Sequence, residues 1–355
     1  MVDLHETYEI RCPVHGFIPV DSWEWELINQ PAFQRLRRIR QLALTDMVYP
    51  GANHTRFEHS LGVMHVADLL YEAIVRRSKK VLQDALAYNE DGFRRDRKLV
   101  RLAALLHDVG HSPFSHAAES LFPYQEDGKE RFRHEQYSAA IIRGPLKEAI
   151  EGHPLNQNYG LGAEEIAALI EGRISASRSV FWRELISGQM DADRVDYLLR
   201  DSLHSGVDYG KFDWRRLVNS VEAARFDEGR GLRLGVGEGG FHAAEGLVLA
   251  RYFMFTQVYF HKTRVAFDHH LLQALKHMLP SGCFPRPTSG DLDQFLQWDD
   301  WKVAGMLSEG KGGEHGRRIV ERAHFREVYH TGETPDLLEL DRLNKVRDLL
   351  GNLVQ

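Results

Sequence analysis

The chain has 355 residues and a formal net charge of −6, and 43% of its residues are apolar. This length suffices for one large domain or two, and the acidic balance disfavours a dominant nucleic-acid-binding surface. No apolar run approaches the roughly 18 residues that a membrane-spanning helix needs. The two cysteines give no disulfide framework, and residues 1–6 lack the pattern of a signal peptide. We therefore expect a cytoplasmic protein with no membrane partner, and nucleic acid is not an expected partner.

The predicted elements are mostly helical. A short strand over residues 8–11 comes first, and Pro31 suits the first turn of a helix that runs over residues 33–42. Apolar residues then recur at helical spacing over residues 61–70, 163–170, 181–186 and 247–272. Residues 231–236, flanked by turn residues, predict a small β-hairpin arm. We expect a mainly α protein that divides into an N-terminal strand and loop segment (1–30), a catalytic domain (31–284) and a C-terminal helical region (285–355).

A set of metal-ligand residues is the most informative feature of the sequence. His107 and Asp108 close the apolar run Leu99–Leu106, while His59 lies upstream and Asp193 downstream. Imidazole nitrogen and carboxylate oxygen are donors that first-row divalent metals accept. Each residue alone is better explained as a helix cap or a hydrogen-bonded side chain. The four together predict one metal site that is assembled from several helices.

The segment that carries Asp193 tests this idea. At about 100° per residue, its polar side chains fall within one sector of a helix. They are Asp193, Asp196, Tyr197, Arg200 and Asp201, and the opposite sector holds Val195, Leu198 and Leu199. The polar sector must face either solvent or a polar cleft, and the tyrosine among the charges favours the cleft.

A second group of polar residues follows the His107-Asp108 pair. Pro113 restricts the backbone and predicts that His111 and His116 stay near the metal. Glu119 lies three residues past His116, so its carboxylate could orient an imidazole. His134 could deliver a proton to a leaving oxygen, because histidine titrates near neutral pH. It could equally be an ordinary residue at the start of a helix, and the sequence leaves both interpretations open.

Arginines recur around these residues. Guanidinium groups bind phosphate oxygens in a bidentate manner, so a metal surrounded by arginines predicts a phosphorylated substrate. The nearest to the candidate site are Arg56, Arg194 and Arg251. Arg35 and Arg38 lie on the predicted helix at 33–42, and we expect them to be solvated or ion-paired. No glycine-rich phosphate-binding loop is present in the sequence, so phosphate binding would depend on metal and side chains.

Four longer strings resemble the deoxynucleoside triphosphate triphosphohydrolase (dNTPase) branch of the HD-domain phosphohydrolase superfamily. They are residues 34–37 (QRLR), 56–63 (RFEHSLGV), 107–116 (HDVGHSPFSH) and 193–201 (DRVDYLLRD). The resemblance implies an HD-domain helical fold with a small β-hairpin arm and a C-terminal helical extension. It also implies that His59, His107, Asp108 and Asp193 are the metal ligands.

The resemblance further implies hydrolysis of a deoxynucleoside triphosphate (dNTP) to deoxynucleoside and triphosphate through a metal-activated water. His134 would be the general acid, oriented by Glu119, while His111 and His116 would contact phosphate or the attacking water. Gln41 and Asp201 would hold the sugar 3′-hydroxyl, Tyr259 would pack against the sugar, and Arg56, Arg194, Tyr197 and Arg251 would bind phosphates. The cofactor would be one divalent metal (Mn, Fe, Zn, Ni or Mg), with an additional Mg²⁺ able to bridge the phosphates. Family members commonly form homo-oligomers, so a dimer or higher assembly is expected.

The sequence departs from the vertebrate members of this branch at several positions. Phe255 replaces a histidine of their substrate pocket, Asn29 replaces the acidic residue of their regulatory nucleotide site, and Cys12 stands where the early loop usually carries aspartate. Activation by a bound nucleotide is therefore not expected. Two other functions stay open: an HD-type nucleotide monophosphatase or phosphodiesterase acting on another nucleotide, and a catalytically silent nucleotide sensor.

Overall fold

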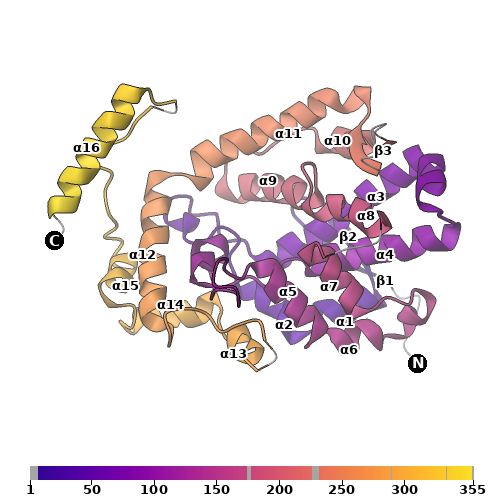
Figure 1. Ribbon diagram of the computed structural model, residues 1–355, viewed down its shortest axis with the longest axis horizontal. Helices are drawn as coiled ribbons and strands as arrows, with labels where there is room; N and C mark the ends of the chain where they lie inside the picture. The colour runs from indigo at the N-terminus through magenta and orange to yellow at the C-terminus, as the bar shows by residue number, and fades with distance from the viewer. Residues whose placement is uncertain (1–6, 174–176, 226–231, 289, 333, 354–355) are drawn as a thin grey trace.

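The structure is a computed structural model that describes residues 7–173, 177–225, 232–288, 290–332 and 334–353. It confirms the mainly α fold: helices make up the body, and the described strands form two antiparallel two-stranded sheets (Figure 1). The strands are β1 (Thr7–Cys12), β2 (Gly16–Asp21), β3 (Val221–Arg225) and β4 (Leu232–Val236).

The α-helices up to the second sheet are α1 (Ser22–Ile28), α2 (Pro31–Gln34), α3 (Arg56–Leu86), α4 (Glu90–Leu106), α5 (His134–Arg143), α6 (Lys147–Glu151), α7 (Ala163–Glu171), α8 (Ser177–Ser187), α9 (Ala192–Ser205) and α10 (Trp214–Ser220). After it come α11 (Phe241–Met254), α12 (Lys262–Met278), α13 (Leu292–Leu296), α14 (Asp300–Ser308), α15 (Gly313–Val320) and α16 (Leu337–Leu353). Short 3₁₀ turns are η1 (Arg35–Arg38), η2 (Thr45–Met47), η3 (Ser115–Leu121), η4 (Pro154–Asn158) and η5 (Glu238–Gly240), and η6 (Phe255–Tyr259) is a π-helical turn.

Helices α3 and α4 form the centre of the core. The apolar run 99–106 of α4 is buried throughout, and α3 packs against both α4 and α9. Gly62 permits the close contact between α3 and α9, since a Cβ at this position would lie 1.9 Å from an Asp196 carboxylate oxygen. Gly110 has the same role after α4, because a Cβ there would lie 2.2 Å from the backbone nitrogen of Ser138 on α5. These two glycines bring α9 and α5 up to the helix ends that carry His59 and His107.

The N-terminal hairpin is tied to the core by a buried charge network. Strand β1 contains the predicted strand at residues 8–11, and it pairs with β2, which the sequence did not reveal. Asp21 at the end of β2 caps α1, which presents Glu24 to α4. The carboxylate of Glu24 is fully buried and accepts hydrogen bonds from Lys98 Nζ at 2.6 Å and Arg101 Nε at 2.7 Å. Burial alone would raise the pKa of Glu24, but the charges of Lys98 and Arg101 outweigh it and lower the pKa to about 2.

Replacing Glu24 with glutamine is expected to destabilise the protein by about 3–5 kcal/mol, because two buried cations lose the carboxylate that they share and keep only Asp21 and Asp68 as partners. Urea unfolding at pH 7 measures this loss, and Glu26→Gln, on the exposed side of α1, is the matched control with an expected effect within about 0.5 kcal/mol. The folded-state pKa lies below the unfolded value, so the stabilisation is present above about pH 4.5 and is lost as the pH falls toward 2. Equal stability of the two variants would contradict this account of the network.

The predicted helix at residues 33–42 is wrong beyond its first turns. Helix α2 ends at Gln34, η1 ends at Arg38, and Arg40 then forms an isolated β-bridge with Thr55. Tertiary hydrogen bonds replace helical ones here: Gln41 N donates to His54 O at 3.0 Å, and Arg40 N donates to the Asp300 carboxylate at 2.8 Å. This pairing places Gln41 beside the start of α3.

The expectation for Arg35 is also corrected. Its side chain is buried: Nε donates to Trp298 O at 2.9 Å and one terminal nitrogen donates to His111 O, also at 2.9 Å. The guanidinium lies 5.0 Å from the centre of the Phe295 ring, a cation–π contact. Arg38, by contrast, is ion-paired with Asp299 at 2.5 Å, as expected.

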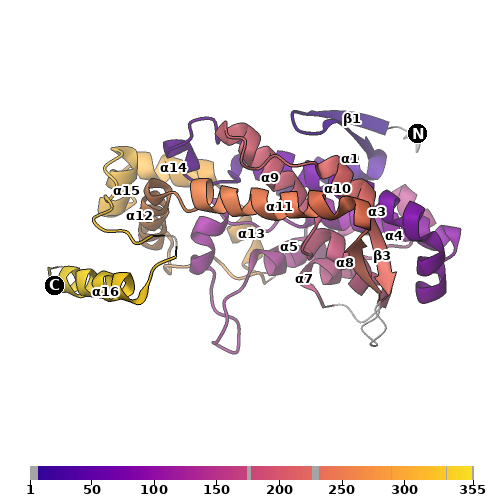
Figure 2. The ribbon, with the colours of Figure 1, turned by 90° about the horizontal axis from the view of Figure 1, so that it is seen from above.

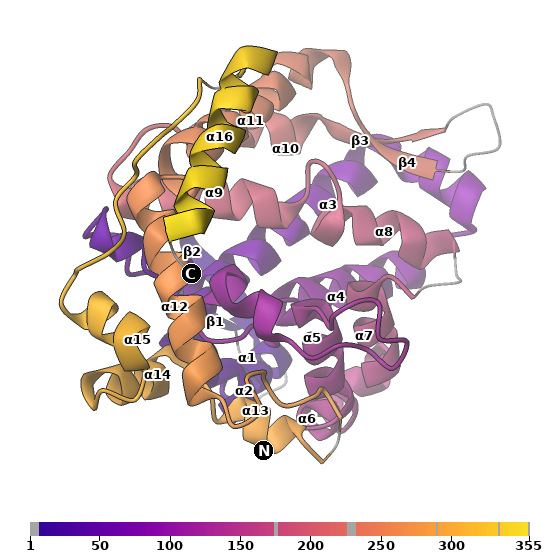
Figure 3. The same ribbon diagram turned by 60° about the vertical axis from the view of Figure 1, so that its left-hand side comes forward.

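The second sheet is the predicted hairpin arm. Strand β4 covers 232–236 of the predicted segment, whose residue 231 lies outside the described residues, and it pairs with β3. Figure 3 shows the arm at the edge of the helical body, where Glu184 of α8 accepts a hydrogen bond from Leu234 N at 2.9 Å. The C-terminal part is helical as expected, and α16 lies apart from the rest of the molecule in the view from above (Figure 2). Among the described helices, none combines the length and apolar character that crossing a membrane requires.

Candidate metal centre and active-site cavity

A cavity of about 460 Å³ brings together most of the predicted site residues. Eleven of them line it: Gln41, Arg56, His107, Asp108, His111, His116, His134, Asp193, Tyr197, Asp201 and Tyr259. His59 and Glu119 lie directly behind this wall, in contact with Asp193 and His134, respectively. Arg194 and Arg251 are not among the lining residues.

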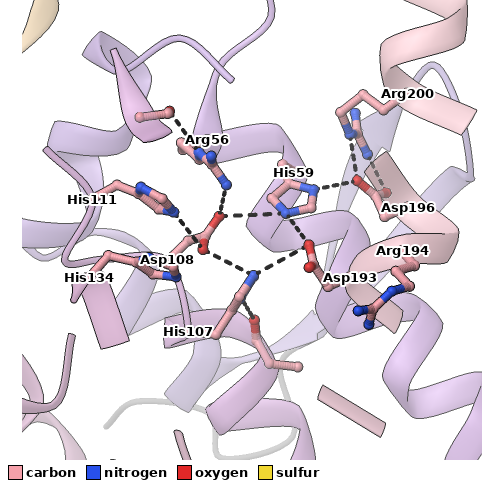
Figure 4. A network of polar contacts seen from close by, with 12 residues as sticks. Arg56, His59, His107, Asp108, His111, His134, Asp193, Arg194, Asp196 and Arg200 are labelled. Carbon is pink, nitrogen blue, oxygen red and sulfur yellow. Dashed lines mark hydrogen bonds and ion pairs between the residues drawn. The ribbon is translucent and has the colours of Figure 1, made fainter. Parts of the chain in front are cut away.

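The four predicted metal ligands converge at the cavity, three of them in its wall and His59 directly behind it (Figure 4). His59 Nε2 lies 3.0 Å from an Asp193 oxygen and 3.5 Å from an Asp108 oxygen. His107 Nε2 lies 3.2 Å from the other Asp108 oxygen and 3.9 Å from Asp193. Donor atoms that share one cation at bond lengths of about 2.0–2.1 Å are roughly 2.9–3.4 Å apart. The observed separations are therefore close to those of a ligand set around one metal ion.

The second ring nitrogen of each histidine is fixed by a hydrogen-bonding partner. His59 Nδ1 contacts the Asp196 carboxylate at 2.8 Å, and His107 Nδ1 contacts Ala104 O at 2.7 Å. Both Nε2 atoms are buried and lack a hydrogen-bond partner. Burial opposes a positive charge on His59, but the neighbouring carboxylates of Asp193 and Asp196 outweigh it and raise its pKa to about 10. The site thus favours a positive charge and presents orphaned nitrogen donors, and both properties fit a divalent cation.

Asp196 is a positioning residue that the sequence-based search for ligands missed. Its carboxylate is fully buried and also accepts two hydrogen bonds from Arg200 at 2.8 Å and one from His15 Nε2 at 2.6 Å. The polar residues of α9 therefore fall into two groups. Asp193, with Tyr197 and Asp201, faces the polar cavity as favoured, whereas Asp196 and Arg200 are buried against α3. The signal for this role is the spacing of Asp196 from Asp193, three residues along the same helix.

Replacing Asp196 with asparagine is expected to weaken binding of Mn²⁺ by about 10–100-fold, because the contact that orients His59 loses its charge. Isothermal titration of the metal-stripped protein measures the affinity. Glu58→Gln is the matched control: the Glu58 carboxylate lies 4.0 Å from an Arg200 nitrogen and accepts its hydrogen bond from Thr55 N rather than from His59. A change of less than twofold in Asp196→Asn would exclude the positioning role.

A second group of imidazoles surrounds Glu119. The carboxylate of Glu119 lies 2.6 Å from His134 Nδ1 and 3.0 Å from His116 Nδ1, and His111 stacks on His134 with ring centres 4.0 Å apart. Burial alone would lower the pKa of His134, but the hydrogen bond and charge of Glu119 outweigh it and raise the pKa to about 9. His134 is therefore held as a protonated imidazolium at neutral pH, which suits a proton donor. Burial, together with the charges of Arg56 and His134, lowers the pKa of His111.

The turn that carries these histidines has an unusual backbone. Phe114 and Ser115 adopt left-handed conformations with φ of 58° and 56°, which side chains other than glycine rarely adopt. Asp300 of α14 holds this turn, since its carboxylate accepts a hydrogen bond from Phe114 N at 2.7 Å. Burial raises the pKa of Asp300 to about 7, against two backbone hydrogen bonds that lower it. The C-terminal helical region therefore contributes directly to the shape of the cavity.

Polar groups at the other end of the cavity are suited to a hydroxyl-bearing ligand. Tyr259 donates its hydroxyl hydrogen to Asp201 at 2.6 Å, and His54 Nε2 contacts the second Asp201 oxygen at 2.7 Å. The side-chain oxygen of Gln41 is buried without a hydrogen-bond partner. Phe255 lies edge-on to Tyr259, with ring centres 5.1 Å apart. This end of the cavity thus combines the aromatic rings of Tyr259 and Phe255 with the unpaired side-chain oxygen of Gln41.

The arginines differ in placement. Arg56 lines the cavity and donates to Asp108 at 2.6 Å and to Ser115 Oγ at 2.9 Å. Arg194 turns away to Gly188 O and the carboxylate of Asp191, and the exposed Arg251 lies 5.4 Å from the Phe255 ring centre. Their predicted phosphate contacts stay a prediction. Arg264, which the sequence did not single out, lines the cavity and lies 3.1 Å from Asp268.

Comparison with known proteins gives matches over most of the chain. A family described as HD domain matches residues 56–201, and one described as HD associated region matches residues 212–345. The protein YwfO of Bacillus subtilis is 38% identical over 265 residues, which cover 73% of this chain and 53% of that protein. The protein named deoxynucleoside triphosphate triphosphohydrolase SAMHD1 homolog of Dictyostelium discoideum is 37% identical over 196 residues, 54% of this chain and 35% of that protein.

A solved structure is also similar: the crystal structure of a hypothetical protein from Aquifex aeolicus has a TM-score of 0.75 and 32% sequence identity, covering 91% of this chain and 78% of that chain. The chain spans about half the length of the curated relatives it matches. The HD-domain match begins at Arg56 and ends at Asp201, so it contains all four residues of the metal set. These matches show that the chain belongs to the HD-domain superfamily of metal-dependent phosphohydrolases and is similar to its deoxynucleoside triphosphate triphosphohydrolase branch.

Proposed function

We propose that the protein hydrolyses deoxynucleoside triphosphates to deoxynucleoside and inorganic triphosphate. The observation that carries this proposal is the joint placement, around one cavity, of the metal set, the His134–Glu119 pair and the Asp201–Tyr259 pair. A nucleoside triphosphate needs all three features: charge neutralisation at the phosphates, a proton for the leaving 5′-oxygen and polar contacts for the sugar. The dNTPase named among the relatives supports the same substrate class.

His59, His107, Asp108 and Asp193 would hold a divalent cation, which would lower the pKa of water and neutralise charge on the phosphate oxygens. In this reaction the oxygen of a water molecule would bond to the α-phosphorus while the bond between that phosphorus and the sugar 5′-oxygen breaks. His134 would donate its proton to that oxygen, while Glu119 keeps the imidazole protonated and oriented. Arg56, which donates two hydrogen bonds in the cavity wall, would bind a phosphate oxygen beside Asp108.

The sugar would lie against Tyr259. Burial and the neighbouring Asp201 carboxylate raise the pKa of the Tyr259 hydroxyl, so it stays a neutral hydrogen-bond donor. The unsatisfied oxygen of Gln41 is an acceptor for the 3′-hydroxyl, and Asp201 is the second. A 2′-hydroxyl would be crowded by the tyrosine ring, which favours deoxynucleotides over ribonucleotides.

The products distinguish the proposed reaction from the alternatives. Purified protein incubated with each dNTP and Mn²⁺ is expected to release deoxynucleoside and intact triphosphate, which ³¹P NMR and chromatography identify. Orthophosphate from a nucleoside monophosphate, or a linear product from a cyclic dinucleotide, would instead support the other HD-type activities. The absence of turnover with every nucleotide would support a sensor. The metal identity and the expected homo-oligomer stay predictions.

A further inference from the structure

A second group of metal-binding donors lies beside the HD metal set. Three imidazoles and one carboxylate, from His111, His116, Glu119 and His134, present donor atoms that all lie within 4.8 Å of one another. The residues come from the loop after α4, the turn η3 and the first turn of α5. No atom of the predicted HD metal set belongs to this group.

The distances within the group resemble those of a coordination sphere. One Glu119 oxygen lies 2.6 Å from His134 Nδ1, 3.0 Å from His116 Nδ1 and 3.7 Å from His111 Nδ1. Two ligand atoms of a tetrahedral cation with bonds of about 2.0–2.1 Å are separated by roughly 3.3 Å. The three observed values lie on either side of this separation, so movements of well under 1 Å would bring each of these oxygen–nitrogen distances to it.

His111 supplies the independent sign that a ligand is missing. Its side chain is fully buried, and Nε2 lies 3.2 Å from an Asp108 oxygen. Nδ1, on the side of the second group, has no hydrogen-bond partner, since the Glu119 oxygen beside it is 3.7 Å away. A buried polar atom without a partner is costly, and such atoms in a folded protein call for a bound group. His116 is exposed, with 61% of its side-chain surface accessible, and it gives a cation a path from solvent to the buried donors.

We propose that His111, His116, Glu119 and His134 form a second metal site, which takes a transition-metal dication such as Zn²⁺ or Ni²⁺. Three imidazoles and one carboxylate suit these ions, whereas Mg²⁺ prefers oxygen ligands and retains its water. This second site and the HD metal set share no residue, so both can hold a cation at the same time.

Occupancy of this site switches off the general acid, a consequence that rests on the proposed function. A cation bound at His134 Nδ1 replaces the proton and the contact with Glu119. The neutral imidazole that remains holds its Nε2 proton far more tightly than an imidazolium does, so it cannot supply a proton to the 5′-oxygen. Excess Zn²⁺ is thus expected to inhibit dNTP hydrolysis in protein whose HD site already holds Mn²⁺.

Metal stoichiometry tests the site without any reference to turnover. The full chain is stripped with a chelator, equilibrated with Zn²⁺ buffered at micromolar free concentration and analysed for bound zinc. The wild-type protein is expected to bind two equivalents, and His116→Ala one. His116 is exposed, so its removal does not threaten folding, and His242→Ala is the matched control because its ring is 95% accessible and it should retain two equivalents.

A second variant confirms which equivalent is lost. His107→Ala/Asp108→Ala is expected to retain one zinc, and combining it with His116→Ala should leave none. One equivalent in the wild-type protein, or two in His116→Ala, would overturn the proposal. If dNTP hydrolysis is absent but two equivalents bind, the proposed function fails and the second site stands. If dNTP hydrolysis occurs but only one equivalent of zinc binds, the second site is overturned and the proposed function stands.

Discussion

Asp193→Ala is expected to reduce dNTP hydrolysis by about 10³-fold or more while leaving the fold intact. Asp193 is the one ligand of the metal set that α9 supplies, and its oxygen lies 3.0 Å from His59 Nε2 and 3.9 Å from His107 Nε2. Without Asp193, the cation loses an anionic ligand and is held less firmly. The phosphate charge that this cation would neutralise is then compensated less well. Initial rates at saturating dNTP and Mn²⁺ measure the effect.

The control for this variant is Asp208→Ala, an aspartate whose side chain is 85% accessible on the loop after α9. It should retain wild-type rates, and circular dichroism should give the same melting temperature for both variants. Unchanged hydrolysis in Asp193→Ala would exclude the metal set as the catalytic centre, whatever cation the protein contains.

His134→Gln is expected to lower the rate by about 10²–10⁴-fold, the usual contribution of a general acid. The wild-type rate should fall as the pH rises through about 9, because His134 must be protonated to act and its pKa is raised to that value. Glu119→Gln removes the charge that raises this pKa, so the alkaline limb should move toward lower pH. Rates measured between pH 6 and 10 record the shift.

Glu135→Gln is the matched control for Glu119, since its carboxylate lies 3.7 Å from the same His134 nitrogen but forms no hydrogen bond with it. Its effect on the alkaline limb should be much smaller. If Glu119→Gln leaves the limb in place, Glu119 does not set the protonation of His134. If His134→Gln retains full activity, another group donates the proton.

The helical fold could be predicted because its signals are local. The apolar spacing of residues 61–70 follows the buried face of α3, and the apolar run 99–106 matches the buried end of α4. The helix predicted at 33–42 failed for a non-local reason. Arg40 and Gln41 pair with the segment before α3 and with Asp300 of α14, and no local pattern signals such contacts. Strand β2 has buried Ile18 and Val20 alternating with exposed residues, but it was missed because Pro19 interrupts the pattern and proline argues against a strand.

The site shows the same contrast between local signals, which the sequence carries, and contacts between distant segments, which it does not. The residue types that bind metals identified His59, His107, Asp108 and Asp193, and the structure brings them together at one cavity, with His59 directly behind its wall. The contact that supports His59 from behind was not predicted. Asp196 was noted only as part of a polar helix face, and its contact with His59 depends on how closely Gly62 lets α9 approach α3.

The C-terminal region illustrates how distant residues complete the cavity. Asp300 holds the left-handed turn at Phe114, and Arg35 links Trp298 O to His111 O. Arg264 of α12 lines the cavity and is a further basic group near the proposed phosphates. Asp300 and Arg264 lie outside the four strings that carry the family resemblance, so only the assembled structure relates them to the metal set. Arg35 lies within one of these strings (residues 34–37), but its contacts with Trp298 and His111 were not predicted.

A crystal structure of the Mn²⁺-loaded protein, with anomalous scattering recorded at the manganese edge, tests the central claim most directly. We expect an anomalous peak within coordinating distance of His59 Nε2, His107 Nε2 and the carboxylates of Asp108 and Asp193. Density for manganese elsewhere and none between these four side chains, in protein that hydrolyses dNTPs, would contradict the account.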